Sequence, residues 1–93
     1  MKKVFILPSF ERSLKKLSSD DKKKLSKSLE AFNSFLFSGQ TSSGLRLKKI
    51  NHDKYEFRID KKLRVIIKEE DDIFYLVLTG DHDEVRRYLR NFR

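Results

Sequence analysis

The sequence contains no cysteine, which excludes disulfide bonds and thiolate metal sites. It also lacks any apolar stretch that approaches the roughly 20 residues of a transmembrane helix. The four apolar residues from Val4 to Leu7 are fewer than the core of a signal peptide needs. We therefore expect a cytoplasmic protein that makes no contact with a membrane.

Glycine and proline are scarce, with three and one residues, and the one linker-like stretch, Ser38 to Gly44, is too short to separate domains. A chain of 93 residues makes a single domain, 1–93. The apolar fraction of 38% is low and the charged fraction of 39% is high, which raises the question of disorder. An aromatic fraction of 12% argues against disorder, because these rings supply area for a core.

Positive charge is abundant and unevenly placed. The formal net charge is +8, and residues 45–68 hold nine Lys and Arg against three Asp and Glu, whereas residues 69–93 hold four against seven. A local basic block is typical of proteins that bind nucleic acid or an acidic protein. The alternative is that the charge serves solubility alone.

Hydrophobic periodicity predicts a short strand at 4–7 and then two helices. Pro8 stands where a helix can begin, and Phe10, Leu14 and Leu17 then recur at helical spacing. Ser18, followed three residues later by Asp21, is typical of a helix N-terminus. The second helix carries one apolar stripe, formed by Leu25, Leu29, Phe32 and Leu36. Two such helices with a short break predict an αα-hairpin.

After the hairpin the period changes to the two-residue alternation of β-strands. Strands are predicted at 55–59, 63–68 and 73–78, and the short polar breaks between them require antiparallel pairing. In the last strand, alternation places Phe74, Leu76 and Leu78 on one face. A further short strand can form at 45–50, and a helical turn or two at 83–92.

The expected fold class is α+β, with the order β-α-α-β-β-β and an optional short C-terminal helix. Each helix has one apolar stripe, so both should cover one face of an antiparallel sheet. The other face would carry Glu56, Arg58, Arg64, Ile66 and Lys68. A ligand is expected on that face or at its end near His82.

One histidine follows the last predicted strand, in Leu78-Thr79-Gly80-Asp81-His82-Asp83-Glu84-Val85. A strand fixes the position of such a residue and a loop exposes it, which suits an acid or base. Arg58 and Arg64 share a face and offer planar donors to phosphate. Cleavage of RNA needs a base for the 2′-OH, an acid for the 5′-oxygen and cations for the phosphorus. The alternative for the arginines is ion pairing with Glu56 or Asp60.

Several other residues admit two interpretations. The histidine and carboxylates at 80–84 could hold a metal, but no second histidine lies at ligand spacing, so we expect neither a metal nor a cofactor. His52 is interpreted as a turn residue, and Lys22 to Lys24 as a solvated helix face. Tyr88 and Phe92 could stack on unpaired bases or pack a terminal helix onto the sheet.

Several segments resemble the RelE/ParE superfamily of toxins from toxin–antitoxin systems, and together they cover nearly the whole chain. They are residues 10–17, Gly44-Leu45, Tyr55 to Asp60, Leu63-Arg64-Val65-Ile66, which is similar to the family's "yRvi" strand, and Gly80 to Val85, which is similar to its ending "G-x-H-D-E-V-Y". Their order and spacing in a chain of this length are typical of the family.

The resemblance implies a ribosome-dependent, metal-independent mRNA endoribonuclease that inhibits translation. A cognate antitoxin would hold it inactive in a hetero-oligomer. The resemblance assigns His82 as acid or base and Arg64 as the arginine that stabilises the phosphate, and it matches Arg58 to a basic position on the preceding strand. The RNA-binding residues that we expect are Lys48, Lys49, Lys61, Lys62, Lys68, Arg86, Tyr88 and Phe92.

Two positions depart from the family pattern. Glu56 lies in a strand that is richer in lysine in RelE itself. Arg86 stands where an aromatic residue usually follows, so Tyr88 or Phe92 would have to supply a stacking ring. The ParE branch shares the fold but inhibits DNA gyrase, and an inactive relative would only bind its antitoxin, so fold alone does not assign the activity. Because the chain is basic, we expect an acidic antitoxin segment near Arg58, Arg64 and His82.

Overall fold

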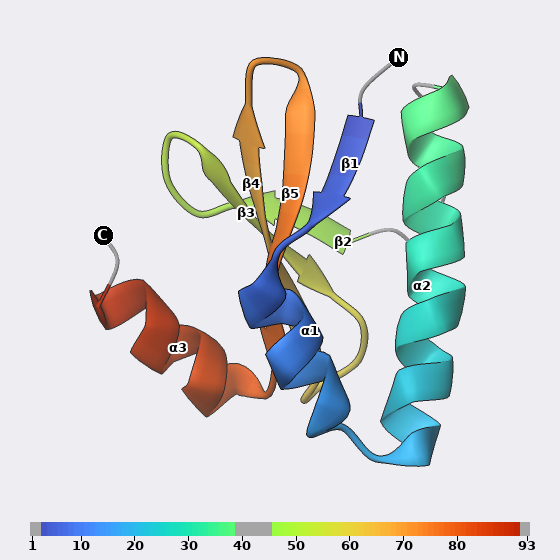
Figure 1. Cartoon of the computed structure of the whole chain (residues 1–93), viewed down its shortest axis with the longest axis vertical. Coiled ribbons are helices and arrows are strands. Elements are labelled where there is room, and N and C mark those ends of the chain that lie inside the picture. Colours follow the sequence, from blue (N-terminus) through green and yellow to red (C-terminus); the bar gives the residue numbers. More distant parts are fainter. Residues whose placement is uncertain (1–2, 39–45, 92–93) are drawn as a thin grey trace.

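The computed structural model describes residues 3–38 and 46–91, which form a central sheet with helices on both of its faces (Figure 1). The elements are β1 (Lys3–Ile6), α1 (Pro8–Lys15), α2 (Ser19–Ser38), β2 (Arg46–Lys49), β3 (Lys54–Arg58), β4 (Arg64–Glu70), β5 (Ile73–Gly80) and α3 (His82–Asn91). Within the described ranges, no helix is long and apolar enough to cross a membrane.

The strands lie in the order β1-β5-β4-β3-β2. The neighbours from β2 to β5 are antiparallel, as the short breaks between them predict. The α+β class and the helical hairpin are confirmed. The further short strand expected at 45–50 forms over 46–49 and pairs with β3, so four strands follow the hairpin. One correction concerns β1, which lies parallel to β5, so the sheet is mixed. Parallel pairing is allowed because two helices and three strands intervene between β1 and β5.

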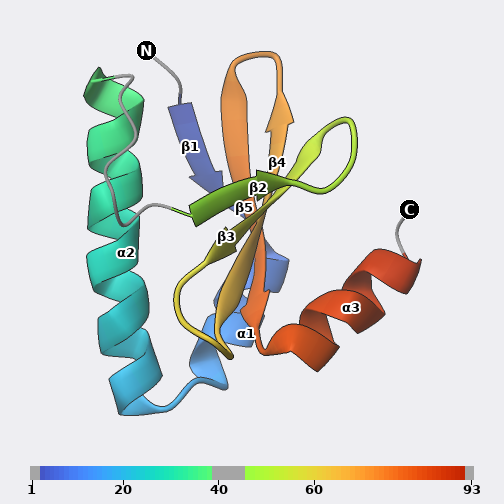
Figure 2. The same cartoon turned by 180° about the vertical axis from the view of Figure 1, so that it is seen from behind.

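The main core lies between the sheet and the hairpin of α1 and α2 (Figures 1 and 2). Phe32 of α2 has its ring centroid 5.8 Å from that of Phe57 on β3 and 5.5 Å from that of Phe74 on β5. The other buried members are Phe10, Leu25, Leu63, Val65, Ile67 and Leu76. With these residues turned inward, the alternate side chains of β3 and β4 face away from the hairpin.

The opposite face carries a second, smaller apolar cluster beneath α3. Ile66 of β4, Val77 of β5 and Val85 of α3 are buried there. The terminal helix begins at His82 and has 10 residues, so it starts one residue earlier and is longer than predicted. It leaves the end of β5 on the side away from α2 (Figures 1 and 2).

A β-bulge interrupts the pairing of β4 with β5. Ile66 pairs with Leu78, whereas Ile67 pairs with Leu76, so the register shifts between them. The prediction that Leu78 shares a face with Phe74 and Leu76 is therefore wrong, and Leu78 packs in the cluster under α3. One extra residue in a strand reverses the alternation beyond it.

The helix starts follow the signals in the sequence. Pro8 is the first residue of α1, where its missing N–H costs no helical hydrogen bond. The hydroxyl oxygen of Ser18 accepts a hydrogen bond from the N–H of Asp21 at 3.1 Å, as expected of an N-cap.

Serine side chains of α1 complete the edge of β5 beyond the end of β1. The Ser9 hydroxyl donates to the carbonyl of Val77, and the Ser13 hydroxyl oxygen accepts from the N–H of Thr79 at 3.0 Å. Thr79 then donates its hydroxyl to the carbonyl of Arg64 at 3.0 Å. Ser13, Thr79 and Arg64 are buried, so this chain of hydrogen bonds ties the backbone of β4 to α1.

Asp60 closes the turn between β3 and β4. Its carboxylate accepts hydrogen bonds from the backbone N–H groups of Leu63 and Lys62 at 2.7 and 2.8 Å, and Lys24 of α2 donates to it at 3.1 Å. The backbone hydrogen bonds from Leu63 and Lys62 lower the pKa of Asp60 to about 2.

We expect the Asp60 carboxylate to contribute stability at neutral pH that is lost on acidification. Its pKa lies below the unfolded value of about 3.9, so the loss occurs between about pH 4 and about pH 2. Asp60→Asn keeps an acceptor for the turn but cannot titrate. Urea unfolding should therefore show the variant to be less stable than wild type at pH 7, with a difference that shrinks over this window. A difference that stays constant would contradict the assignment.

Ser13→Ala should destabilise the fold by ~1–3 kcal/mol, because it leaves the buried N–H of Thr79 without an acceptor. For a domain of this size, each kcal/mol lowers Tm by roughly 4–8 °C, which thermal unfolding resolves. Ser9→Ala is the matched control, because Ser9 is only half-buried and water can replace its hydroxyl. The role of Ser13 would be refuted if the control cost as much.

Candidate functional site

A row of backbone pairs at one end of the sheet brings the candidate arginines together. Arg58 on β3 pairs with Arg64 on β4, and Arg64 pairs with Gly80 on β5. Side chains of directly paired residues lie on the same face, with Cβ atoms roughly 4.5–5.5 Å apart. The chain then enters α3 at His82, two residues after Gly80. The sheet thus places two of the predicted site residues side by side and starts the histidine helix at the same end.

Arg64 is a largely buried cation, with 8% of its surface exposed. Its Nη1 atom lies 3.2 Å from Oε2 of Glu56, and its Nε atom has no hydrogen-bond partner among the described residues. The alternative interpretation of an ion pair with Glu56 is therefore correct for Arg64. The predicted pairing with Asp60 does not occur in the described structure, where Asp60 bonds Lys24 instead.

Arg58 is exposed and, within 3–38 and 46–91, makes no ion pair. It lines a small hollow of about 170 Å³ together with Glu56, Lys48 and Leu47. Lys48 pairs with Glu56 across β2 and β3. Two exposed cations around one carboxylate give this part of the face a net positive charge, which suits a phosphate.

His82 is exposed and is the first residue of α3, so it lies on a helix rather than in the predicted loop. Asp81 caps this helix by accepting a hydrogen bond from the N–H of Glu84 at 2.9 Å. One turn later, Nη2 of Arg86 lies 2.6 Å from Nε2 of His82. Because arginine has donors only, this contact is a hydrogen bond in the tautomer whose Nε2 accepts.

The predicted RNA-binding lysines divide by position. Lys61 and Lys62 are exposed in the turn between β3 and β4, next to the Arg58–Arg64 pair. Lys68 lies at the other end of β4, where its ammonium bonds Glu70 at 3.2 Å, and this hydrogen bond raises the pKa of Lys68. The register puts Lys49 on the face opposite to Lys48.

Of the two aromatic residues considered for base stacking, the structure describes only Tyr88. Tyr88 is half-buried and packs against the cluster of Ile66, Val77 and Val85. This packing matches the alternative interpretation of a terminal helix that holds its ring on the sheet. Phe92 lies outside the described residues.

Two carboxylates near Arg64 were missed as site residues in the sequence. Glu56 bonds Arg64, and its alternation with Arg58 on β3 was the available signal. Glu84 of α3 lies over Gly80, because a Cβ on this glycine would come within 3.0 Å of the Glu84 carboxylate. Among the residues with described placement, no group of three His, Asp or Glu side chains could hold a metal ion.

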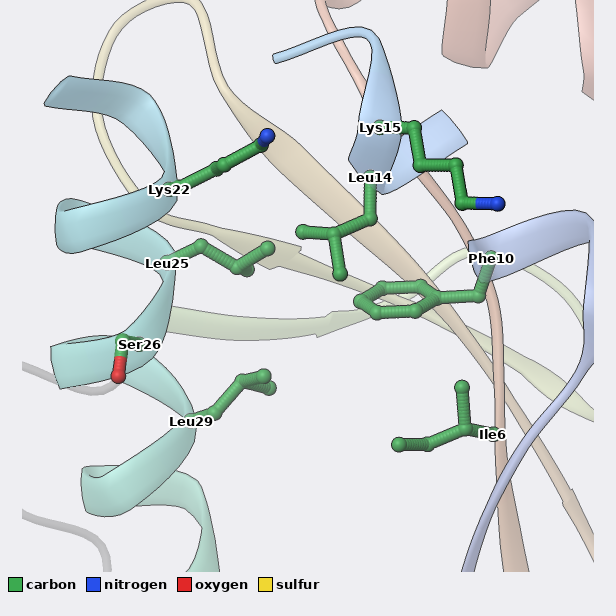
Figure 3. Close-up of a pocket in the computed structure, with 8 residues that line it drawn as sticks. All are labelled: Ile6, Phe10, Leu14, Lys15, Lys22, Leu25, Ser26 and Leu29. Atoms are coloured by element: carbon green, nitrogen blue, oxygen red, sulfur yellow. The ribbon is translucent and has the colours of Figure 1, made fainter. Parts of the chain in front are cut away.

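A second surface feature lies away from the arginines. An apolar groove of about 420 Å³ runs between the helices of the hairpin, and Figure 3 shows Phe10 and Leu14 of α1 facing Leu25 and Leu29 of α2 across it. Ile6, at the end of β1, lines its mouth.

β1, the edge strand beside this groove, is apolar and open. Val4, Phe5 and Ile6 are 38%, 49% and 54% exposed. Among the residues that the structure describes, β1 pairs with β5 alone, so its other side offers backbone hydrogen-bonding groups to a partner.

Comparisons with known proteins identify the fold. No family model matches the chain, and no curated protein matches it. Among solved structures, it is similar to the RelB–RelE antitoxin–toxin complex from Methanococcus jannaschii, with a TM-score of 0.70, 17% identity and coverage of 90% of this chain and 96% of that chain. The chain is also similar to the E. coli DinJ–YafQ complex, with a TM-score of 0.68, 12% identity and coverage of 91% of this chain and 98% of that chain. Its similarity to the YoeB dimer from Staphylococcus aureus has a TM-score of 0.64 at 19% identity, with coverage of 87% of this chain and 97% of that chain. The chain therefore has the fold of RelE, YafQ and YoeB.

Proposed function

We propose that this chain is the toxin of a toxin–antitoxin pair and cleaves mRNA on the ribosome. The observation that carries the proposal is the row Arg58–Arg64–Gly80, followed at once by His82 on α3. It brings planar phosphate donors and a titratable imidazole to one end of the basic face. The likeness of the fold to toxins solved with their antitoxins supports the same conclusion.

Each of these side chains has a distinct task in the cleavage of a phosphodiester. Arg58 is exposed and binds the phosphate first. Arg64 is held rigidly by the sheet, so its guanidinium stabilises the charge that develops on the phosphorus in the transition state. His82 moves a proton, either from the 2′-OH or to the departing 5′-oxygen. Arg86 occupies Nε2 of His82 in the free protein, and binding of Arg86 to an RNA phosphate releases that nitrogen.

Removing His82 or Arg64 should abolish most of the chemistry. His82→Ala and Arg64→Ala should each slow single-turnover cleavage on saturated ribosomes by ~10²-fold or more, the scale for losing a general acid–base or one transition-state donor. His82→Ala should leave the free energy of unfolding unchanged, because the imidazole is exposed. The readout is the rate of appearance of cut mRNA, followed by primer extension.

Lys27→Ala is the control, since it removes a positive charge from an exposed position on α2, in a different layer. Normal cleavage by folded His82→Ala would refute the role of that residue. If the wild type stops growth with intact mRNA and altered DNA supercoiling, the ParE-like alternative holds instead. If the wild type has no effect on growth, the chain is an inactive relative.

We also propose that the antitoxin anchors on β1 and on the groove between α1 and α2. β1 offers a free strand edge with three exposed apolar side chains, and a partner strand added there would cover them. Lys15 and Lys22 line the groove, so the partner segment should be apolar with acidic flanks. The sequence-based expectation of an acidic segment near Arg58 and Arg64 stays a prediction beside this one.

Phe5→Glu should weaken binding of the antitoxin by at least ~10-fold in Kd, because it places a charge in an apolar contact. Titration calorimetry measures the change, and cleavage activity should stay normal, since Phe5 is remote from the arginine row. Ile50→Glu is the matched control, because Ile50 is 36% exposed and follows β2 at the opposite edge of the sheet. Equal weakening by both variants would contradict the assignment of the edge.

A further inference from the structure

Glu56 makes the ion pair that holds Arg64. It lies on β3 between Lys54 and Arg58, on the face turned away from the hairpin, and is a diagonal neighbour of Arg64 on β4. The side chains of Arg64 and Glu56 are 9% and 18% exposed, so the 3.2 Å contact is largely shielded from water. A shielded, charge-assisted hydrogen bond restrains a guanidinium more strongly than a pair on an open surface does.

The charges around Glu56 make this restraint necessary. Arg58 and Arg64 lie directly opposite each other, and like charges in this arrangement repel. Lys48 faces Glu56 from β2, and Glu84 approaches the row from α3 over Gly80. Among the described residues, only Glu56 bonds the guanidinium of Arg64. Glu56 is therefore the contact that offsets the repulsion between Arg58 and Arg64.

We propose that Glu56 is a positioning residue for Arg64. Its carboxylate accepts from Nη1 and thereby fixes the plane of the guanidinium, and the N–H donors of Nη2 are kept for a phosphate, whereas Nε is buried. This inference rests on the proposed function, because it concerns the orientation that a bound phosphodiester needs.

The two effects of Glu56 on the site have opposite signs. Its negative charge repels RNA phosphates and therefore weakens binding of the substrate. Its contact with Arg64 preserves the geometry for the chemical step and therefore raises the rate. Loss of Glu56 should tighten binding of RNA and slow cleavage at the same time, which a purely structural role would not produce.

The experiment compares three variants in single-turnover cleavage on ribosomes. Glu56→Gln removes the charge and should slow the saturated rate by about 10-fold or more, with an equal or lower half-saturating concentration. Glu56→Asp keeps the charge but shortens the side chain, so it should slow the rate without tightening binding. Glu70→Gln makes the same neutral exchange at the far end of β4 and should leave the rate unchanged. A normal or faster rate in Glu56→Gln, or a normal rate in Glu56→Asp, overturns the proposal.

A readout without activity separates this inference from the proposed function. The ¹⁵Nε–H resonance of Arg64 should have a high order parameter in the wild type and a lower one in Glu56→Gln, with inorganic phosphate as the titrated probe. Urea unfolding confirms that each variant is folded. If the wild type cuts no mRNA, the proposed function fails, and the order parameter still decides whether Glu56 holds Arg64. An unchanged order parameter in folded Glu56→Gln overturns the proposal.

Discussion

The pairing of β4 with its two neighbours is the constraint on which both the core and the candidate site depend. Val65 and Ile67 of this strand enter the main core, whereas Arg64 faces the opposite side. Backbone pairing with β3 and β5 holds Arg64 on both sides, and Thr79 bonds its carbonyl. A backbone held at so many points can place a guanidinium with the accuracy that transition-state stabilisation requires.

Apolar burial and the arginine pair contribute to stability with opposite signs. Each large apolar side chain buried under α1 and α2 stabilises the fold by roughly 1.5–3 kcal/mol. The like-charged pair of Arg58 and Arg64 costs a fraction of this, since cross-strand pairs contribute only about 0.2–1 kcal/mol. Burial on one face therefore outweighs repulsion on the other. This difference in magnitude lets a small domain keep a cationic row that its own stability does not favour.

Local patterns in the sequence predicted the elements well, because their causes lie within a few residues. Pro8 and Ser18 start the two helices, and alternation on β3 and β4 separates core from charged residues. The parallel pairing of β1 with β5 was not predictable in this way, since it joins residues about 70 positions apart. The β-bulge at Ile66 and Ile67 was not predictable, because the residues of β5 beside it, Val77 and Leu78, are both apolar and fit either face of the sheet.

In the candidate site too, the features with local causes were predictable and those that depend on strand register were not. Arg58 and Arg64 were placed on one face by alternation alone, and the register of β3 against β4 puts them directly opposite. The contact of Glu56 with Arg64 needed that register, because the two residues are diagonal neighbours. His82 was expected in a loop, yet Asp81 caps a helix that begins at the histidine. The side chain of Asp81 caps α3, and the backbone of His82 is therefore helical.

The open edge of β1 is explained most simply by the proposed partnership. An exposed apolar edge strand promotes unwanted pairing between chains, and natural proteins usually shorten, charge or cover it. Here the strand has only four residues and begins with Lys3, which limits the hazard, but Phe5 and Ile6 stay half exposed. In the proposed complex, the antitoxin would cover this edge. A surface that is a liability in a solitary chain would then serve as the anchor for the partner.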